Sequence, residues 1–402
     1  MLRLPTENTS DREEKTMTEW QTVRLGEIVK TNQSTYSPKE NWQFVNYLDT
    51  GNITMNKIDE IQNINTAKDK LPSRARRKVK TNSIIYSTVR PNQLHYGIIK
   101  KQPDNFLVST GFTVIDVNYD KAVPDFIYYA LTKQEVTEQL QAIAEQSVSA
   151  YPSLKPSDIE NLELMLPDKK TQERIVAILR SIDEKIKENN AINNNLEQQA
   201  QAIFKSWFID FEPFSNRKPN DWSISTLGNV SIMGAGGDKP QNVSPIKTDL
   251  YEYPIYSNGL SDEGLYGFTD KPKISEESVT VSARGTIGFV CLRHIPYVPI
   301  VRLVTLIPKA EIISAKYLYL WLKQLHITGT GTTQQQLTVP DFQKTEILVP
   351  SQEIVTLFTA TVEPIFEKIW ANQNENEKLS SLRDTLLPKL MSGELDVSNI
   401  EI

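Results

Sequence analysis

The chain is poor in the residues that build disulfide frameworks and metal sites. Its 402 residues include one cysteine, Cys291, and three histidines, His95, His294 and His326. A single cysteine excludes a disulfide framework and suits a reducing compartment. The histidines are widely spaced, and no cysteine or carboxylate motif surrounds them. We therefore expect no metal site in this chain.

Long apolar runs are also missing. No apolar stretch reaches transmembrane length, and no charged-then-apolar leader opens the chain. Residues 1–16 are polar and charged without periodicity, which predicts a disordered tail and makes Met17 an alternative start. These features predict a soluble cytoplasmic protein that does not associate with a membrane.

The sequence signatures of common enzymes are absent as well. There is no Gly-x4-Gly-Lys-Ser/Thr phosphate loop, no Asn-Pro-Pro-Tyr-like motif for base methylation and no Gly-x-Ser-x-Gly elbow. Residues 234–237 are glycine-rich but lack the dinucleotide spacing, and we interpret them as a mobile turn. The chain is therefore predicted to be a non-catalytic recognition or scaffold subunit.

What the chain does have is a long internal repeat. Trp20 with Leu25-Gly26 returns as Trp222 with Leu227-Gly228. Three longer correspondences follow in the same order, namely 83–87 with 278–282, 126–131 with 317–322, and 154–207 with 337–390 without a gap. Ordered anchors of this length indicate two copies of a whole module, not a solenoid of short units. Such a duplication suits a two-part target.

The first part of each copy has the pattern of a globular α/β domain. Residues 79–89 and 278–290 carry β-branched runs bounded by Asn, Gly and Pro, which is typical of strands. Residues 125–144 and 315–325 have apolar side chains at three- and four-residue spacing, which predicts helices. The overall fold class is therefore α+β.

The second part of each copy has the seam of a coiled coil. From Ile175 to Trp207 the seam positions follow one another at alternating steps of four and three, and all of them are apolar residues or asparagines. The same steps run from Phe358 to Leu390, where Arg383 is the one other residue. Two helices of about 35–40 residues, each roughly 55 Å long, are predicted to pack on each other. Proline and a capping residue precede each helix, Pro167-Asp168 in the first and Pro350-Ser351 in the second.

Seam asparagines suggest the direction of pairing. Antiparallel packing sets Asn189 against Asn376 and Asn193 against Asn372, and it also brings Trp207 to Phe358. A parallel pair would stack asparagine on asparagine too, but antiparallel helices place the two globular domains at opposite ends. We therefore favour the antiparallel pair, in which the polar layer fixes the register.

Two prolines oppose a straight second helix. Pro364 is expected to kink this helix or delay its start, and Pro388 is expected to end it. On that expectation the outermost layer, Ile175 with Leu390, does not form.

The net charge of −6 describes the whole chain, whereas binding uses a local patch. Residues 68–80 contain seven basic side chains and Asp69 as the only acid. This run is either a nucleic-acid contact or an ordinary solvated surface.

Taken together, the duplicated domains and helices resemble the specificity subunit of type I restriction-modification systems. The resemblance covers nearly the whole chain after Met17. Four kinds of feature carry it: the domain openings at Trp20 and Trp222, the domain closings at 162–167 and 346–350, the helix start at 172–179 and the chain end at 386–395. On this resemblance we divide the chain into a tail (1–16), a first target-recognition domain (17–166), a first conserved helix (167–212), a second target-recognition domain (213–349), a second conserved helix (350–395) and a tail (396–402).

The resemblance implies a role in host defence. Each domain would read one half of an interrupted double-stranded DNA site, and the coiled coil would set the spacing and dock two DNA methyltransferase subunits. Those partners would carry S-adenosylmethionine, and motor-nuclease subunits would use ATP and Mg, so that no cofactor is expected in this chain. The half-sites would lie about one duplex turn apart.

The DNA-contacting residues are predicted from position and chemistry. Long cationic side chains suit phosphates, whereas Arg, Asn and Gln after a strand can contact base edges. In the first domain the phosphate candidates are Arg74, Arg76, Arg77, Lys78 and Lys80, and the base candidates are Arg90, Asn92 and Gln93. In the second domain the candidates are Lys271 and Lys273 for phosphates, and Arg284 and Thr286 for bases. Each of these residues can equally be an ordinary surface residue.

Two matched segments, 147–153 and 330–336, lead into the strand before each long helix, and they are either base readers or structural joints. Tyr128, Tyr129, Tyr319 and Trp321 stand at helical spacing, which favours core positions over base stacking. Two other functions remain open, a duplicated scaffold without a DNA role and a modification enzyme of the fused type.

Overall fold

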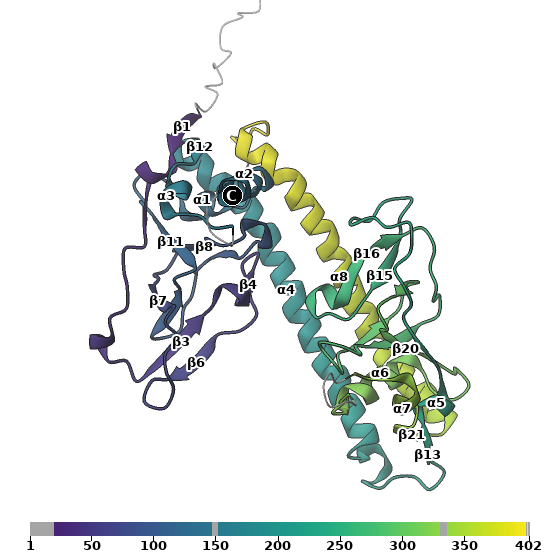
Figure 1. Ribbon diagram of the computed structural model, residues 1–402. Helices are drawn as coiled ribbons and strands as arrows, with labels where there is room; N and C mark the ends of the chain where they lie inside the picture. The colour runs from purple at the N-terminus through teal and green to yellow at the C-terminus, as the bar shows by residue number, and fades with distance from the viewer. Residues whose placement is uncertain (1–19, 147–151, 330–335, 399, 401–402) are drawn as a thin grey trace, which may run out of the picture. The chain divides into compact units, whose positions relative to one another are not determined.

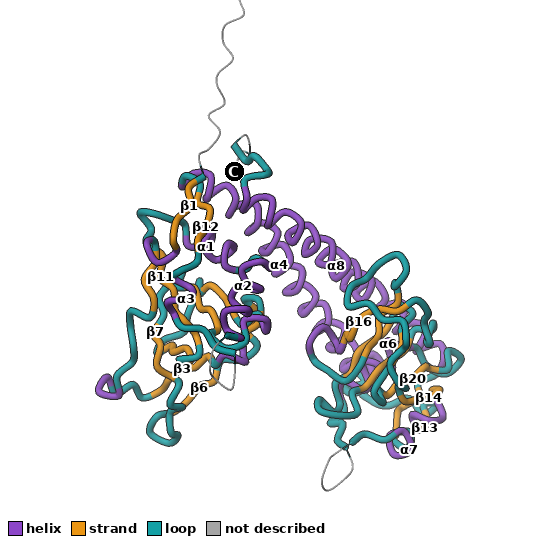
Figure 2. The backbone as a smooth tube through the Cα atoms, turned by 45° about the horizontal axis from the view of Figure 1, so that its top comes forward, coloured by secondary structure: helices purple, strands orange, loops and turns teal. Residues whose placement is uncertain are grey.

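The computed structural model describes residues 20–146, 152–329, 336–398 and 400. The chain divides into two compact units. The first combines the chain up to Lys187 with the chain from Asn376 onward, and the second runs from Glu188 to Glu375. Each unit holds one globular domain and part of each of the two long helices, α4 (Lys169–Phe208) and α8 (Gln352–Ser392) (Figure 1). Strands and loops make up most of each domain (Figure 2). No described helix has the length and apolarity that crossing a bilayer requires.

The domain of the first unit is built on two four-stranded sheets. One is fully antiparallel and has the order β2 (Val29–Thr31), β11 (Phe112–Val117), β8 (Ile84–Ser87), β9 (Tyr96–Ile98). The other has the order β6 (Gln62–Asn65), β3 (Phe44–Leu48), β10 (Phe106–Ser109), β7 (Ala75–Lys78), with β3 and β10 parallel. Smaller elements are β1 (Gln21–Arg24), β4 (Ile53–Thr54), β5 (Lys57–Ile58), β12 (Glu163–Leu166), α1 (Pro124–Leu131), α2 (Gln134–Glu145) and α3 (Pro156–Glu160).

The domain of the second unit repeats this topology. Its antiparallel sheet has the order β14 (Ser231–Ala235), β20 (Val304–Pro308), β17 (Ser278–Val281), β18 (Val290–Arg293), which matches the first domain strand for strand. Its mixed sheet has three strands in the order β16 (Leu265–Thr269), β15 (Tyr253–Tyr256), β19 (Val298–Pro299), and β15 and β19 are parallel, as β3 and β10 are in the first domain. The remaining elements are β13 (Ser223–Thr226), β21 (Glu346–Val349), α5 (Leu227–Val230), α6 (Ala315–Gln324) and α7 (Val339–Phe342). The predicted α+β repeat is confirmed.

The repeated Leu-Gly motif has a packing cause. Each domain is closed by an antiparallel pair of its first and last strands, β1 with β12 and β13 with β21. A side-chain carbon at Gly26 would lie 3.2 Å from Glu160 Cβ, and one at Gly228 would lie 3.1 Å from Gln343 Cβ. Only glycine allows the backbone to approach this closely without displacing a neighbour.

The predicted secondary structure holds with local corrections. The expected helix over 125–144 is split into α1 and α2 near Thr132 and Lys133, whereas α6 covers nearly the whole expected range. The glycine-rich residues 234–237 are not a turn, because β14 runs through Ala235 and Gly236 donates its N–H to Leu303 O at 2.8 Å. A side-chain carbon at Gly236 would lie 2.7 Å from the backbone of Ile300, so glycine is needed for close packing there.

The long helices run antiparallel, as predicted. In the second unit the end of α4 faces the start of α8, where the rings of Trp207 and Phe358 lie 5.7 Å apart. Further along the seam of that unit, Asn372 Nδ2 donates to Asn193 Oδ1 at 2.8 Å. Asn189, which is buried, donates to Glu375 Oε2 at 2.9 Å. Its predicted pairing with Asn376 stays a prediction.

The expected helix end at Pro388 is wrong, and so is a delayed helix start at Pro364, whereas a kink at Pro364 stays a prediction. Helix α8 begins at Gln352, ahead of Pro364, and continues past Pro388 to Ser392, where Gly393 with φ +79° follows. Each proline lacks one N–H donor, but the helix keeps its packing because Val362 and Phe366 beside the first proline, and Leu390 beside the second, are buried. Ile175 and Leu390 are both buried in the same core of the first unit, and their direct contact as a layer stays a prediction.

Helix α4 begins at its predicted cap. Asp168 Oδ1 accepts the backbone N–H of Lys170 at 2.9 Å and that of Thr171 at 3.1 Å. These bonds satisfy two of the donors that a helix leaves unpaired at its start. Partial burial would raise the pKa of Asp168, but the Thr171 hydroxyl, which donates to Asp168 Oδ2 at 2.7 Å, and these two backbone bonds together lower it. The domain limits at residues 166 and 349 stay predictions.

Candidate nucleic-acid interface

The first candidate surface is the loop that follows strand β8. Arg90 is exposed, has a left-handed backbone with φ +49° and donates its N–H to Pro152 O at 3.1 Å. A helical turn at Pro91–Gln93 follows and presents Asn92 and Gln93 on the surface. The three base-contact candidates of this domain are therefore brought together on one tight turn.

The corresponding loop of the second domain follows β17. Arg284 is exposed and donates from Nη2 to Gln336 Oε1 at 2.9 Å, while Gly285 beside it has φ +68°. The Thr286 hydroxyl is buried, and it forms no hydrogen bond with any described residue. Arg284 thus stands at the surface as predicted, whereas Thr286 does not present its hydroxyl there.

Each loop is hydrogen-bonded to the chain just before the short helix that precedes the closing strand of its domain, α3 in the first domain and α7 in the second. Leu154 N–H donates to Thr88 O at 2.7 Å, and in the second domain Leu337 N–H donates to Ala283 O at 3.0 Å. The described ends of the segments 147–153 and 330–336 also contact these loops, through Pro152 O and the bridge of Ser153 with Val89 in the first domain and through Gln336 in the second. These contacts support the joint interpretation for the described ends. Residues 147–151 and 330–335 lie outside the described residues. The sequence did not identify Gln336 as the hydrogen-bond partner of Arg284, because the two residues lie far apart along the chain.

The phosphate candidates of the first domain lie on or next to strand β7, at the edge of the mixed sheet. Arg74 is exposed, and Arg76 and Arg77 are half-buried. Arg76 Nε donates to Ser73 O at 3.3 Å, and burial lowers the pKa of Arg77. An arginine keeps its charge under such a shift, so Arg74, Arg76 and Arg77 are all cationic at this edge.

The two lysines of this run have acidic neighbours. Lys78 forms an ion pair with Glu40 and lies 5.1 Å from the ring centre of Trp42. Lys80 Nζ lies 3.6 Å from Asp116 Oδ2. These pairs reduce the local positive field, so Arg74 and Arg76 are stronger phosphate candidates than Lys78 or Lys80.

The second domain places its lysine candidates at the matching edge. Lys271 and Lys273 are exposed, and Ile274 next to them forms an antiparallel bridge with Tyr297, directly before β19. In the first domain β7 pairs with β10, the counterpart of β19, in the same antiparallel sense. The two sets of phosphate candidates therefore occupy equivalent positions in the two domains, which the sequence did not reveal.

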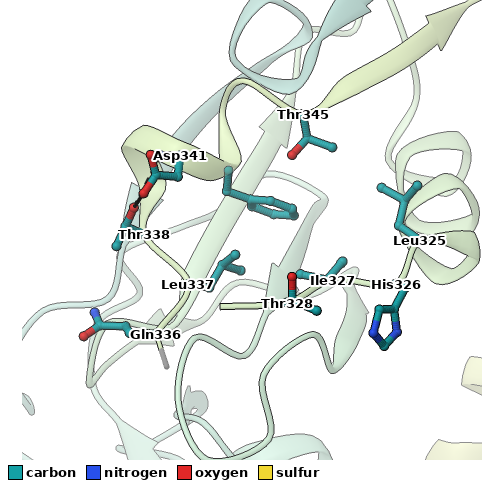
Figure 3. Close-up of a pocket in the computed structure, with 10 residues that line it drawn as sticks. Leu325, His326, Ile327, Thr328, Gln336, Leu337, Thr338, Asp341 and Thr345 are labelled. Carbon is teal, nitrogen blue, oxygen red and sulfur yellow. Dashed lines mark hydrogen bonds between the residues drawn. The ribbon is translucent and has the colours of Figure 1, made fainter. Parts of the chain in front are cut away.

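A small pocket lies beside Gln336, the residue that accepts a hydrogen bond from Arg284 (Figure 3). Its volume is about 260 Å³, and its lining includes Gln336, Leu337 and Leu325. Thr338 and Asp341, joined by a 2.8 Å hydrogen bond, lie on one side of the lining and His326 on the other. The pocket is below the usual ~300–1,000 Å³ of small-molecule sites, which favours a surface contact at this place over an enclosed ligand.

The remaining candidates for chemistry have structural roles. Burial raises the pKa of the Cys291 thiol to about 12, and His294 stacks on Trp370 with ring centres 4.1 Å apart. Within the described residues no group of His, Cys, Asp and Glu side chains is arranged to hold a metal ion. Tyr128, Tyr129 and Tyr319 are buried, which confirms their prediction as core residues.

Known proteins agree with this duplicated architecture. The family model described as the type I restriction modification DNA specificity domain matches residues 17–198 and again residues 219–380. The chain is similar to the HindI specificity subunit of a type I restriction enzyme from Haemophilus influenzae, with 29% identity over 94% of this chain and 100% of that protein. It is 28% identical to the MjaIX specificity subunit from Methanocaldococcus jannaschii over 76% of each chain. The crystal structure of a type I restriction-modification S subunit from M. genitalium has the same fold, with a TM-score of 0.56, 17% identity, and coverage of 94% of this chain and 98% of that chain.

The double match covers well over half of the chain, and the fold agrees with it. The chain belongs to the family of type I restriction-modification specificity subunits. It is therefore the DNA-recognition component of such a system, not a catalytic one, and this replaces both the scaffold and the fused-enzyme alternatives.

Proposed function

We propose that the two globular domains each read one half of a bipartite, interrupted double-stranded DNA sequence. The observation that carries this proposal is the repeated placement of the candidate residues. Each domain has an exposed arginine on the loop after its central strand, β8 or β17, and cationic side chains at the same edge of its mixed sheet. Two copies of one reading module with different loop residues suit two different half-sites.

The chemistry of the loops suits base contacts. An arginine can donate two hydrogen bonds to guanine O6 and N7, and the amides of Asn92, Gln93 or Gln336 can pair with adenine N6 and N7. The Arg284–Gln336 contact holds one guanidinium nitrogen and leaves further donors on the same group. The cationic strand edges would contact phosphates, which adds affinity without adding sequence information.

In this proposal the antiparallel helices α4 and α8 set the spacing between the half-sites and dock two DNA methyltransferase subunits. The methyltransferases would carry S-adenosylmethionine, and motor-nuclease subunits with ATP and Mg would complete the restriction enzyme. The polar seam layer of Asn189, Asn193, Asn372 and Asn376 would hold the register of the helices. The family membership supports an assembly of this kind.

The proposal is tested by selecting duplexes from a random DNA pool with the purified complex of this chain and its methyltransferase partner. We expect enrichment of one sequence with two fixed halves and an unspecified gap of constant length. The control is the methyltransferase alone. An enriched sequence without a gap, or the same sequence from the methyltransferase alone, would contradict the proposal.

A further inference from the structure

In each domain a helix that packs in the core, α1 in the first and α6 in the second, carries a buried tyrosine that donates a hydrogen bond to a carboxylate on α4. In the first unit Tyr129 of α1 donates its hydroxyl to Asp183 Oδ2 at 2.7 Å. In the second unit Tyr319 of α6 donates its hydroxyl to Glu197 Oε1, also at 2.7 Å. Both tyrosines are only 6% exposed. Hydrogen bonds to an ionised carboxylate are short, directional and stronger than those between neutral groups.

A cation completes each contact. Arg383 Nη1 of α8 lies 3.2 Å from Asp183 Oδ1, and Lys323 Nζ of α6 lies 3.0 Å from Glu197 Oε1. Partial burial would raise the pKa of Glu197, but the Tyr319 hydroxyl and Lys323 outweigh it and lower the pKa. The carboxylate therefore stays ionised at neutral pH and keeps the hydrogen bond charge-assisted.

The two tyrosines are not equivalent in the internal repeat. Alignment of 126–131 with 317–322 sets Tyr319 against Tyr128 and sets Tyr129 against Leu320. The same kind of contact is therefore made from different positions of the two helices. Such a recurrence at different positions points to a shared requirement of both domains, since simple inheritance of one ancestral residue would have kept the positions aligned.

In the first unit, packed tyrosines link this contact to the arginine loop. Ring centres lie 5.6 Å apart for Tyr86 and Tyr96, 6.3 Å for Tyr96 and Tyr128, and 5.3 Å for Tyr128 and Tyr129. Tyr86 belongs to β8 and Tyr96 to β9, and these two strands flank the loop of Arg90. In the second unit α6 packs against β17 and β18, the strands that flank the loop of Arg284.

We propose that Tyr129–Asp183 and Tyr319–Glu197 are positioning contacts. Each would hold the domain that carries the Arg90 or Arg284 loop at a fixed place on α4, and so restrict the complex to one gap length between the two DNA half-sites. This inference rests on the proposed function. One added base pair displaces a half-site by about 3.4 Å and rotates it by about 35°. A hydrogen bond tolerates a few tenths of an ångström, so a domain held by such a bond cannot follow the displaced half-site without breaking it.

The test compares duplexes that carry the selected half-sites with the selected gap, or with that gap lengthened or shortened by one base pair. Competition binding with the full complex gives the ratio of Kd values for the wrong and the selected gap. In Tyr129→Phe and Tyr319→Phe this ratio is expected to fall about tenfold, because one charge-assisted hydrogen bond is lost. Preference for the half-site bases is expected to stay unchanged.

Two matched controls separate positioning from general loss of stability. Tyr128→Phe removes a neighbouring hydroxyl from α1 and leaves the Tyr129–Asp183 bond in place. Tyr317→Phe removes a buried bond inside the second domain, from the Tyr317 hydroxyl to Leu348 O at 2.7 Å. Both controls are expected to keep the wild-type gap ratio. If a Phe variant assembles poorly, Glu197→Gln keeps the acceptor oxygen without its charge and is expected to lower the ratio by a smaller factor.

Unchanged gap ratios in Tyr129→Phe, Tyr319→Phe and Glu197→Gln would overturn the inference while leaving the proposed function intact. Equal losses in the controls would also overturn it, because they would assign the effect to stability. A wild-type complex that selects no interrupted sequence would instead refute the proposed function itself.

Discussion

Asn372 of α8 donates a hydrogen bond from its side-chain amide to Asn193 Oδ1 of α4 at 2.8 Å, inside the seam of the second unit. Asn193 in turn donates to the backbone oxygen of Ile369 at 3.3 Å. Asn372 is 1% exposed, so its amide depends on this partner. A buried amide pair of this kind is satisfied in one register of the two helices and unsatisfied in its neighbours.

Replacement of one member of this pair is expected to destabilise the protein. Asn193→Leu leaves the Asn372 amide without its acceptor in the seam, and such a loss costs about 1–3 kcal/mol. The free energy of unfolding from urea denaturation measures this cost. The matched double variant, Asn193→Leu with Asn372→Leu, is expected to recover most of the loss, because both polar groups are then removed. Additive losses in the double variant would show that the two amides act independently.

The cationic edge of the first domain gives a prediction about salt dependence. Arg76→Ala is expected to weaken binding to all DNA sequences alike and to reduce the slope of log K against log salt concentration by about one. Lys78→Ala serves as the comparison on the same strand, since the ion pair with Glu40 already neutralises Lys78. Binding titrations at several salt concentrations measure both slopes. A larger change for Lys78→Ala than for Arg76→Ala would reverse the assignment.

The Arg284–Gln336 contact gives a prediction about base preference. Gln336→Ala removes the group that holds Arg284 Nη2, and we expect loss of about 1–3 kcal/mol of discrimination at one base position of one half-site. Competition with duplexes altered at single positions locates the effect. Gln335 lies outside the described residues, so the matched control is Gln343→Ala at the end of α7. A uniform loss of affinity without a change of preference would instead identify Gln336 as a support of the fold.

The cap of α4 gives a prediction about pH. The lowered pKa of Asp168 means that its stabilising effect is complete above the unfolded pKa near ~4 and is lost as the pH falls through the lower folded value. Asp168→Ala is expected to lose about 0.5–2 kcal/mol of stability at neutral pH. The difference between wild type and variant in thermal or urea unfolding should shrink toward pH 2. Asp168→Asn, which keeps a cap oxygen without a charge, should show a difference that varies less with pH. A constant difference for Asp168→Ala across this range would exclude the charged cap.

Periodicity and repetition in the sequence were sufficient to predict the architecture. The alternating steps of four and three identified both long helices, and the Asn193–Asn372 and Trp207–Phe358 contacts followed from antiparallel alignment of two seams. These contacts depend on regular spacing, which one sequence displays in full. The core position of Tyr129 and Tyr319 was likewise predictable from helical spacing.

The sequence was insufficient where partners are brought together by the sheets or by packing. Two such relationships are the equivalent sheet-edge positions of β7 and the Lys273 segment, and the hydrogen bond between Arg284 and Gln336. They depend on strand order and loop closure, which leave no local pattern in the sequence. The expected helix end at Pro388 and the expected delayed start at Pro364 failed for a related reason. Local rules count the lost donor of Pro364, whereas the helix is held by its buried neighbours Val362 and Phe366.

The central claim is that each domain reads its own half of the DNA site, and one measurement tests it most directly. Methylated adenine is mapped across the genome of cells that express the methyltransferase partner with the wild-type chain, with Arg90→Ala or with Arg284→Ala. We expect one interrupted motif for the wild type, relaxed or lost sequence preference in one half for Arg90→Ala, and the same change in the other half for Arg284→Ala. Relaxation of the same half by both variants, or methylation that does not depend on this chain, would contradict the account.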